Sequence, residues 1–147
     1  MNVPARAVLD TNTVMALWWW QDAKLAPLAR AIDTGAFLLA AREDTLEELT
    51  RVLAYRQFAI PAERQTHIAA TYRARCALPT PSSPESAPLP MCRDADDQKF
   101  LELARDANAA LLISRDKALL RLDRHRLVRS LYRIRTPEAV CAELEAH

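Results

Sequence analysis

Four carboxylate side chains stand where a fold of alternating strands and helices would bring them into one cleft. Asp10 follows the apolar run 7–9 and Asp116 follows the apolar run 111–113, whereas Glu48 and Asp97 lie in helical patterns. Carboxylates gathered in one cleft raise each other's pKa unless a cation lies among them. Carboxylate oxygens are the ligands that hard divalent cations prefer. The arrangement therefore predicts a metal-dependent hydrolase.

Each of these acids also has a purely structural explanation. Asp10 and Asp116 stand where an aspartate often caps the N-terminus of a helix. In the helical pattern that begins at Glu43, Glu48 falls at the edge of the apolar face. Glu47 points further out and precedes Arg51 by four residues, which is typical of a solvated helix ion pair. Glu48 is thus the better candidate for an acid that faces the cleft.

Three aspartates, Asp94, Asp96 and Asp97, precede the apolar face of another helical pattern. Asp94 is placed to cap this helix, and the other two complement the helix dipole. Asp96 and Asp97 both project near the apolar stripe, and helical-wheel geometry alone does not choose between them. The sequence also leaves open whether Asp94 or Asp96 shares a metal site. The hypothesis of a shared site rests on the set of acids rather than on any single one.

Composition narrows the possible functions. The chain has 147 residues, half of them apolar, which predicts one domain over residues 1–147. Its 20 basic and 19 acidic residues leave no overall field that would attract nucleic acid or a membrane. Gly35 is the one glycine, so the glycine-rich loops that cradle phosphates are excluded. Gly35 itself is expected to end a helix.

Cysteine usage and hydropathy favour a cytoplasmic protein. Cys76, Cys92 and Cys141 are far apart in the sequence, which favours reduced thiols over a disulfide framework or a structural zinc site. Asp10 and Asn12 interrupt the apolar run that a secretory signal would need. The longest uncharged apolar stretch, 13–20, is too short to span a bilayer, so we expect no membrane association.

The order of apolar runs predicts an α/β fold. Buried strands are expected at 6–9, 36–40 and 109–113, with a weaker strand at 131–134. Helical patterns occur at 12–20, 23–34, 43–55, 61–75, 95–107, 116–122 and 137–146, the last with Thr136 as N-cap. Such alternation predicts a parallel sheet with helices on its faces. Residues 77–90 contain five prolines and are expected to form a surface loop.

Two local features suggest binding surfaces. Residues 115–135 contain eight Lys or Arg and two acids, so this stretch could contact RNA phosphates, receive an acidic partner or form a solvated, salt-bridged face. Trp18, Trp19 and Trp20 are consecutive and cannot all face one core, so we expect at least one to be exposed, at a protein interface or as a base-stacking platform.

Four segments together resemble the PIN-domain family. They are VLDTNT at 8–13, LEELTRVL at 46–53, CRDADDQKFLELA at 92–104 and LISRDKALL at 112–120. Within that family the sequence is similar to the branch described as toxin components of bacterial type II toxin-antitoxin systems. The resemblance covers nearly the whole chain. It implies a three-layer fold with a mostly parallel sheet of four to five strands, and a Mg²⁺- or Mn²⁺-dependent endoribonuclease.

The resemblance also assigns roles by motif position. The four acids of the family fall on Asp10, Glu48, Asp97 and Asp116, of which we expect Asp10, Asp97 and Asp116 to bind the metal. Asn12 falls on the polar residue that supports the first acid, and Ser114 on the usual threonine. Arg115 departs from the small residue, often glycine, that precedes the last acid; a cation there could bind phosphate or weaken metal binding. Expected partners are an RNA substrate, an antitoxin protein and a second copy of the chain.

Two other functions fit parts of the sequence. A phosphatase of the haloacid-dehalogenase type also begins with an aspartate after a strand, but Asn12 stands where its second acid belongs. A PIN-like module that binds RNA or an antitoxin without cutting is the stronger alternative. The retained acids argue against it, and Arg115 keeps it open. His67, His125 and His147 lie in no zinc-protease or serine-hydrolase motif.

Overall fold

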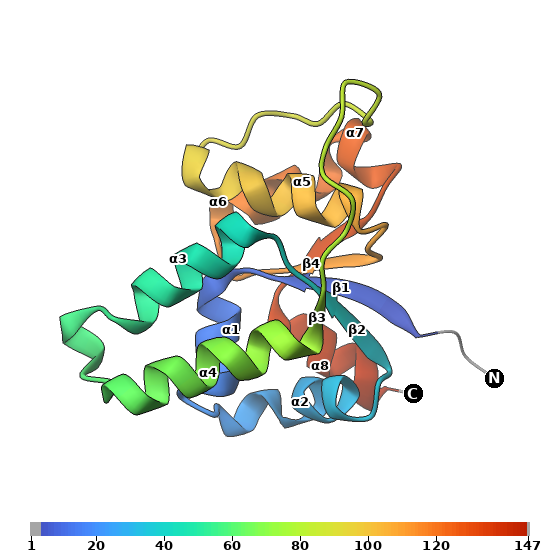
Figure 1. Ribbon diagram of the computed structural model, residues 1–147. Helices are drawn as coiled ribbons and strands as arrows, with labels where there is room; N and C mark the ends of the chain where they lie inside the picture. Colours follow the sequence, from blue (N-terminus) through green and yellow to red (C-terminus); the bar gives the residue numbers. More distant parts are fainter. Residues whose placement is uncertain (1–3, 147) are drawn as a thin grey trace.

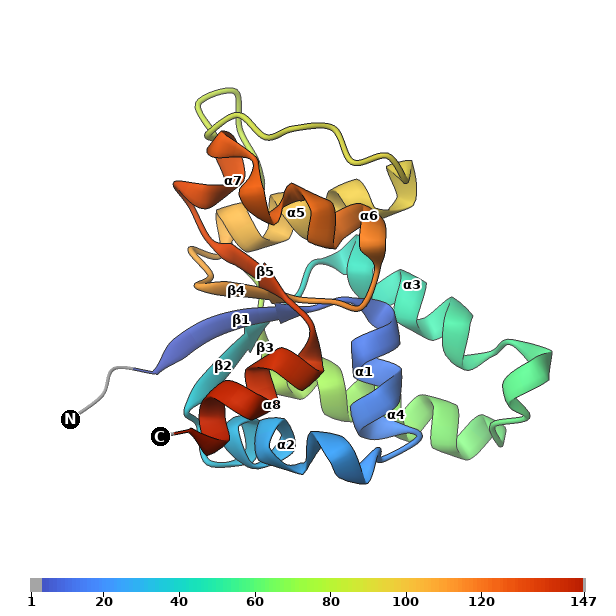
Figure 2. The ribbon, with the colours of Figure 1, turned by 180° about the vertical axis from the view of Figure 1, so that it is seen from behind.

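The structure is a computed structural model that describes residues 4–146, and it consists of a parallel sheet between two layers of helices (Figures 1 and 2). The strand order is β3-β2-β1-β4-β5, and every neighbouring pair is parallel. The strands are β1 (Ala5–Leu9), β2 (Phe37–Ala40), β3 (Cys76–Ala77), β4 (Leu111–Ile113) and β5 (Arg133–Arg135). The predicted α/β class, with four to five strands in three layers, is confirmed.

Eight α-helices occur among the described residues, and short 3-10 turns extend several of them. The α-helices are α1 (Thr11–Trp18), α2 (Ala26–Asp33), α3 (Glu43–Leu53), α4 (Ala62–Arg75), α5 (Gln98–Asp106), α6 (Lys117–Leu120), α7 (Arg126–Arg129) and α8 (Pro137–Glu145). The 3-10 turns are η1 (Ala23–Leu25), η2 (Arg56–Phe58), η3 (Ala95–Asp97) and η4 (Arg121–Arg124).

The side chains of each central strand alternate between two cores. From β1, Ala7 and Leu9 enter the core formed with α1, α2, α3, α4 and α8, whereas Val8 enters the core formed with α5, α6 and α7. From β4, Ile113 and Leu112 divide in the same way. Burial on both faces explains why these strands are continuous apolar runs in the sequence rather than alternating ones.

Most expected elements occur near their expected positions, with three corrections. The helix expected at 23–34 is divided at Ala26, because Pro27 in the first turn of α2 starts a new helix. The edge strand β3 and the helix α7 were not predicted. Each has four residues or fewer and too few apolar side chains to produce a periodic signal. Gly35 has a positive φ of 82° after α2, and Thr136 caps α8, as expected.

The proline-rich segment that follows β3 lies on the surface and is anchored to α5. Arg105 donates to the carbonyl oxygen of Ala87 at 2.9 Å and to the hydroxyl of Ser82 at 2.8 Å. Ser82 in turn donates to Asp106 at 2.5 Å. These bonds hold the loop across the end of α5.

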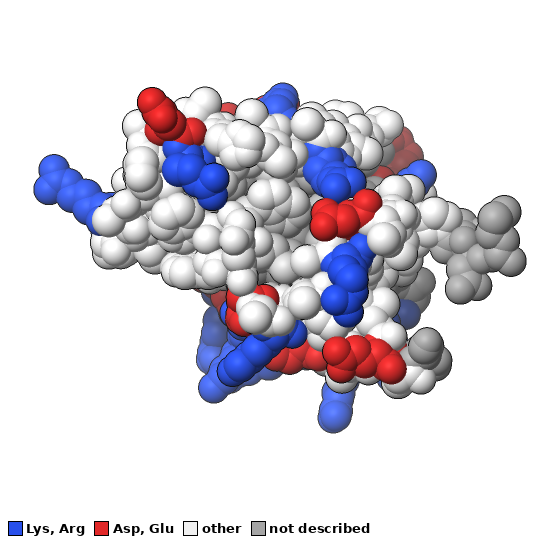
Figure 3. All heavy atoms as spheres, turned by 90° about the horizontal axis from the view of Figure 1, so that it is seen from below, with Lys and Arg blue, Asp and Glu red and all other residues white. Residues whose placement is uncertain are grey.

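Other expectations concern the surface and the thiols. Cys76, Cys92 and Cys141 are free thiols, the last two buried. On the face that carries α2 and α8, basic and acidic side chains lie next to one another (Figure 3), as the near-zero net charge would suggest. Between residues 4 and 146, no helix has both the length and the apolar character that crossing a bilayer requires.

Candidate metal centre

The strand order places two acids at the point where the chain switches from one side of β1 to the other. The chain adds β2 and β3 on one side of β1 and adds β4 and β5 on the other. Open α/β sheets bind ligands beyond the carboxyl ends of the strands at such a point. Asp10 directly follows β1, and Asp116 follows β4 after two residues. The site predicted from the sequence therefore lies where this fold class binds ligands.

Asp10 is buried, with 5% of its surface exposed, and its carboxylate is held by hydroxyl and amide donors. Oδ1 accepts from the backbone amide of Thr13 at 3.0 Å and from its hydroxyl at 2.6 Å, so Asp10 also caps α1. Oδ2 accepts from the hydroxyl of Ser114 at 2.5 Å. Burial raises the pKa of Asp10, and these hydrogen bonds oppose that rise. Asp10 is a positioned acid with few remaining lone pairs.

Ser114 connects the first acid to the last. Its fully buried hydroxyl donates to Asp10 and accepts from the backbone amide of Asp116 at 2.9 Å. Asp116 caps α6, since its Oδ1 accepts from the amide of Ala118 at 2.8 Å. Ser114 therefore contacts both the side chain of the first acid and the backbone of the last.

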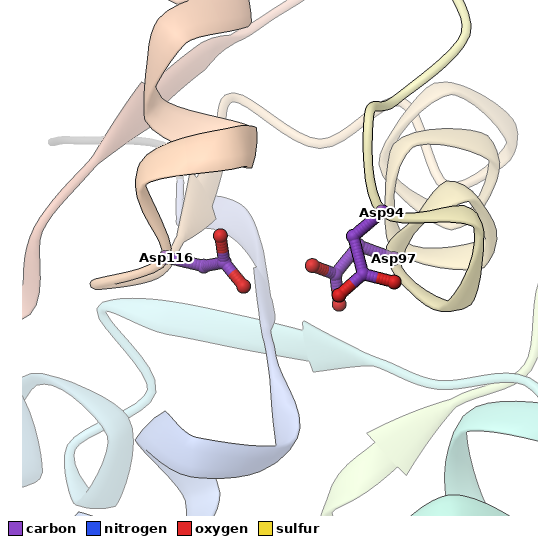
Figure 4. A group of neighbouring side chains, drawn as sticks. All are labelled: Asp94, Asp97 and Asp116. Atoms are coloured by element: carbon purple, nitrogen blue, oxygen red, sulfur yellow. The ribbon is translucent and has the colours of Figure 1, made fainter.

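Three carboxylates converge next to this pair. One ligand oxygen from each of Asp94, Asp97 and Asp116 lies within 4.8 Å of the others. In Figure 4, Asp116 reaches from the β4–α6 side of the cleft toward Asp94 and Asp97 on the other side. We call these residues the acidic triad.

Asp97 is the member of the triad with the least support from the protein. Its Oδ2 is buried and has no hydrogen-bond partner among the described residues. Burial, a hydrogen bond with Asp116 and the negative charge of Asp116, Asp94 and Asp10 raise the pKa of Asp97 to about 7. A buried carboxylate oxygen without a donor is costly, so this position calls for a proton or a cation.

The structure distinguishes the three aspartates that the sequence left open. Asp96 is exposed and lines the cavity but does not join the triad, whereas Asp94 does join it. Asp94 also caps η3, because its side chain accepts from the amide of Asp96 at 3.0 Å. The sequence identified Asp94 as a helix cap and left open whether Asp94 or Asp96 shares the metal site. The signal was present, since a cap residue on the short turn before Asp97 necessarily lies close to it.

Glu48 faces the same cavity, but its charge is already compensated. Its side chain forms an ion pair with Lys99 at 2.7 Å, and it also accepts from the hydroxyl of Thr11. Only 18% of the Glu48 side chain and 15% of the Lys99 side chain are exposed. Glu48 therefore differs from the acidic triad. Among the described residues, no salt bridge joins a carboxylate of the triad to a basic side chain.

The acids line a shared cavity of about 470 Å³. Asn12 is exposed at its wall, while the donors to Asp10 among the described residues are Thr13 and Ser114. The lining residues are Asp10, Thr11, Asn12, Glu48, Arg51, Val52, Tyr55, Gln57, Phe58, Asp94, Asp96, Asp97, Phe100 and Asp116.

Arg115 does not line this cavity. Its guanidinium donates to both carboxylate oxygens of Glu138 on α8 and lies 3.5 Å from Asp22. These two acids raise the pKa of Arg115 and hold it on the α8 side of the molecule. The cation that departs from the expected motif is thus turned away from the triad.

These residues fit a hard divalent cation. The triad supplies oxygen ligands, one of which is buried without a partner, and further negative charge comes from Asp10. Mg²⁺ and Mn²⁺ prefer such carboxylate oxygens, and soft nitrogen or thiolate ligands are absent from the lining. A cation here would relieve the repulsion that raises the pKa of Asp97.

Comparison with known proteins gives one match. Residues 6–118 match the family described as PIN domain, and the matched range contains every acid of the cavity. No curated protein and no solved structure matches the chain. PIN domains are generally nucleases that bind divalent metals, in agreement with the clustered acids found here. By its matching segment and its fold, the chain belongs to the PIN-domain family.

Proposed function

We propose that the protein is a Mg²⁺- or Mn²⁺-dependent endoribonuclease. The observation that carries the proposal is the acidic triad, in which a buried oxygen of Asp97 lacks a partner. An acid cluster that only stabilised the fold would be neutralised by basic residues or hydroxyls, as Glu48 and Asp10 are. Among the described residues the triad has no such basic partner, so a bound cation would be the group that neutralises it.

The proposed metal ligands are Asp97, Asp116 and Asp10, and the geometry adds Asp94 to this set. Asp97 and Asp116 each contribute a carboxylate oxygen to the cluster, and Oδ2 of Asp97 has no hydrogen-bond partner among the described residues. A carboxylate has about four lone-pair sites, and three on Asp10 already accept hydrogen bonds, so Asp10 contributes at most a single contact. Glu48 lines the same cavity, and its proposed role is to act through a water molecule rather than on the ion directly.

If held by Asp97, Asp116, Asp94 and Asp10, a divalent cation would supply an activated water nucleophile, polarisation of the phosphate and compensation of charge on the leaving oxygen. The chain's own contribution is to fix the carboxylates before the substrate arrives. Ser114 links the side chain of Asp10 to the backbone of Asp116 by two hydrogen bonds. These bonds fix the distance between the acid that follows β1 and the acid that follows β4. Preorganised charges of this kind need no rearrangement during the reaction.

The test is cleavage of an unstructured RNA by the purified chain, with and without a chelator. We expect cleavage that EDTA abolishes and that Mg²⁺ or Mn²⁺ restores. Asp97→Asn and Asp10→Asn are expected to lower turnover by at least about 100-fold while the protein stays folded. Asp33→Asn is the matched control, because Asp33 is a 73% exposed aspartate that pairs with Arg75 outside the cavity. Unchanged turnover in the Asp97 variant would refute the proposal.

We further propose that this nuclease is a cytoplasmic toxin with a protein antitoxin, as the resemblance of its motifs suggests. The test is induced expression in a bacterial host, with growth arrest expected for the wild-type chain and normal growth for Asp97→Asn. A second copy of the chain is a further proposed partner, which sedimentation of the purified protein would detect. Normal growth with full RNA cleavage in vitro would remove the toxin assignment and leave the nuclease.

The alternative is a PIN-like module that binds RNA or an antitoxin without cutting. The position of Arg115 removes the main argument for it, because the guanidinium pairs with Glu138 and Asp22 rather than with the triad. RNA binding without any metal-dependent product would favour this alternative.

A further inference from the structure

Aromatic side chains form one wall of the acidic cavity. Tyr55 and Phe58 line the same cavity as the triad, and Trp20 contacts Phe58 from outside it. Tyr55 is 46% exposed and Trp20 is 52% exposed, which is unusual for such large rings. The acids account for the metal centre, but they do not explain why aromatic rings face water beside it.

The position of Tyr55 relative to the acids is set by α3. Glu48 and Arg51 lie one turn apart on α3, and Tyr55 directly follows the C-cap Ala54. The seven residues from Glu48 to Tyr55 correspond to a separation on the order of 10 Å. The backbone amide of Tyr55 donates to Val52 at 3.1 Å, and the amide of Phe58 donates to Tyr55 at 3.2 Å. The aromatic wall is therefore a fixed part of the cavity.

Phe58 supports Tyr55 from the protein side. The two rings stack with centroids 6.0 Å apart and an angle of 26° between their planes. Phe58 also packs against the core that contains α1, α2, α3, α4 and α8. The ring of Trp20 meets the ring of Phe58 edge to face, with centroids 5.3 Å apart. One face of Tyr55 is thus backed by a ring that is anchored in the core, and the side chain retains a large exposed surface.

We propose that Tyr55, supported by Phe58, stacks on an unpaired base of the RNA substrate beside the cleavage position. This inference rests on the proposed function. Stacking on aromatic rings is a sequence-tolerant way to hold single-stranded nucleic acid, because every base has a flat π face. The bases of a duplex already stack on one another and present only their edges, so the base at Tyr55 must be unpaired.

The charges around the wall fit this occupant. Arg51 lies between Glu48 and Tyr55 in the cavity lining and is exposed, so its guanidinium can neutralise a phosphate that the acids would repel. The stacked rise in a nucleic acid strand is about 3.4 Å per nucleotide. A separation on the order of 10 Å between Glu48 and Tyr55 then places the stacked base about three nucleotides from a phosphate that lies near Glu48. Tyr55 is a positioning residue in this scheme and does not touch the reacting atoms.

The experiment separates ring stacking from apolar contact and from catalysis. A fluorescent single-stranded 12-mer RNA is titrated against full-length chain carrying Asp97→Asn, to which Tyr55→Leu or Tyr55→Phe is added. Tyr55→Leu keeps apolar volume without a π face and is expected to weaken binding roughly 5- to 100-fold. Tyr55→Phe is expected to retain binding within about threefold, because the ring remains. Leu131→Ala, a change at another exposed apolar residue outside the cavity, is the control.

An abasic series locates the stacked base. Twelve-mers with a single abasic nucleotide at successive positions should show one position where base removal weakens binding to the Tyr55-containing chain. With Tyr55→Leu that position should lose its effect, because the two changes remove the same contact. In the cleaving protein, Tyr55→Leu should raise KM by a similar factor and leave kcat nearly unchanged. Equal affinity of the Tyr55→Leu and parent proteins, or an unaltered abasic profile, overturns the inference.

The binding assay also distinguishes this inference from the proposed function. If the wild-type chain cuts RNA but Tyr55→Leu changes neither KM nor affinity, only the stacking inference fails. If the wild-type chain does not cut but the abasic profile depends on Tyr55, the nuclease proposal fails and the base-binding wall remains. Circular dichroism melting of each variant confirms that the fold is retained.

Discussion

Asp10 and Asp97 line the same cavity, but their carboxylates differ in how many hydrogen bonds from the protein stabilise their negative charge. Asp10 receives three hydrogen bonds from Thr13 and Ser114, whereas Asp97 keeps a buried oxygen without a partner. Burial raises the pKa of both, and only Asp10 has donors that oppose the rise. The comparison indicates that the fold itself stabilises the Asp10 carboxylate, whereas under the proposed function a bound cation would stabilise that of Asp97.

The first prediction contrasts the stability of two variants in metal-free buffer at pH 8. Asp10→Ala removes the N-cap of α1, worth about 1 kcal/mol, and leaves the buried hydroxyls of Thr13 and Ser114 without their acceptor. We expect the free energy of unfolding to fall by about 2–4 kcal/mol in total. Asp97→Asn removes a repelled charge, so its stability should equal or exceed that of the wild type. Urea denaturation in EDTA measures both.

Asp33→Asn serves as the reference for this comparison, because the Asp33 side chain is exposed. A loss of stability in Asp97→Asn as large as that in Asp10→Ala would contradict the contrast. It would mean that the buried oxygen of Asp97 is satisfied by some contact of the fold itself.

The second prediction concerns pH, and it follows from the pKa of Asp97 at about 7. A metal must displace the proton that Asp97 holds below that pH, so affinity for Mn²⁺ should fall about tenfold for each pH unit below 7. Above pH 8 the affinity should be nearly constant. Calorimetric titration with Mn²⁺ from pH 5.5 to 8.5 measures the slope.

The raised pKa of Asp97 also determines whether the stability of the metal-free protein rises or falls with pH. The ordinary pKa of 3.8 is raised in the fold, so the native state holds this proton more tightly than the unfolded chain does. The stabilising contribution of Asp97 to the free energy of unfolding is present below about pH 4 and is lost as the pH rises toward 7. The difference in unfolding free energy between wild type and Asp97→Asn in EDTA isolates this contribution. A difference that grows in favour of the wild type with rising pH would oppose the assignment.

The sequence predicted the sheet and the place of the acids because those depend on local patterns. Apolar runs doubly buried in a parallel sheet are easy to recognise, and an acid after such a run must emerge at the carboxyl end of its strand. Asp10 and Asp116 were therefore placed at the correct edge of the sheet. The helices α3 and α5 were recognised from their strong apolar stripes.

The missed details depend on contacts between distant segments. The pairing of Lys99 with Glu48 joins α5 to α3, and it leaves no periodic trace in the sequence. Whether Asp94 or Asp96 shares the site stayed open in the sequence because the proximity of Asp94 to Asp116 depends on how η3 meets the end of β4. The direction of Arg115 likewise depended on α8, which is more than twenty residues away.

The third prediction extends the comparison to Glu48, the acid with the strongest compensation. Lys99 and Thr11 already hold its carboxylate, so it should contribute to metal affinity less than the triad does. Glu48→Gln is expected to lower cleavage by roughly tenfold, as for residues that act one contact away from a metal. Initial rates at saturating Mg²⁺ check this value. A loss as large as that of Asp97→Asn would place Glu48 among the direct ligands.

The smallest expected effect is at Arg115, and it tests whether this unusual cation belongs to the site at all. Its guanidinium pairs with Glu138 and Asp22 and is 43% exposed, so the ion pairs contribute under about 1 kcal/mol. Arg115→Ala should leave RNA cleavage within about twofold and metal affinity unchanged, because the charge already faces two acids outside the cavity. Cleavage rates in low and high salt measure this, with Arg75→Ala as an exposed control. A marked gain in metal affinity would show that Arg115 repels the cation after all, and a marked rise in KM would assign it to phosphate binding.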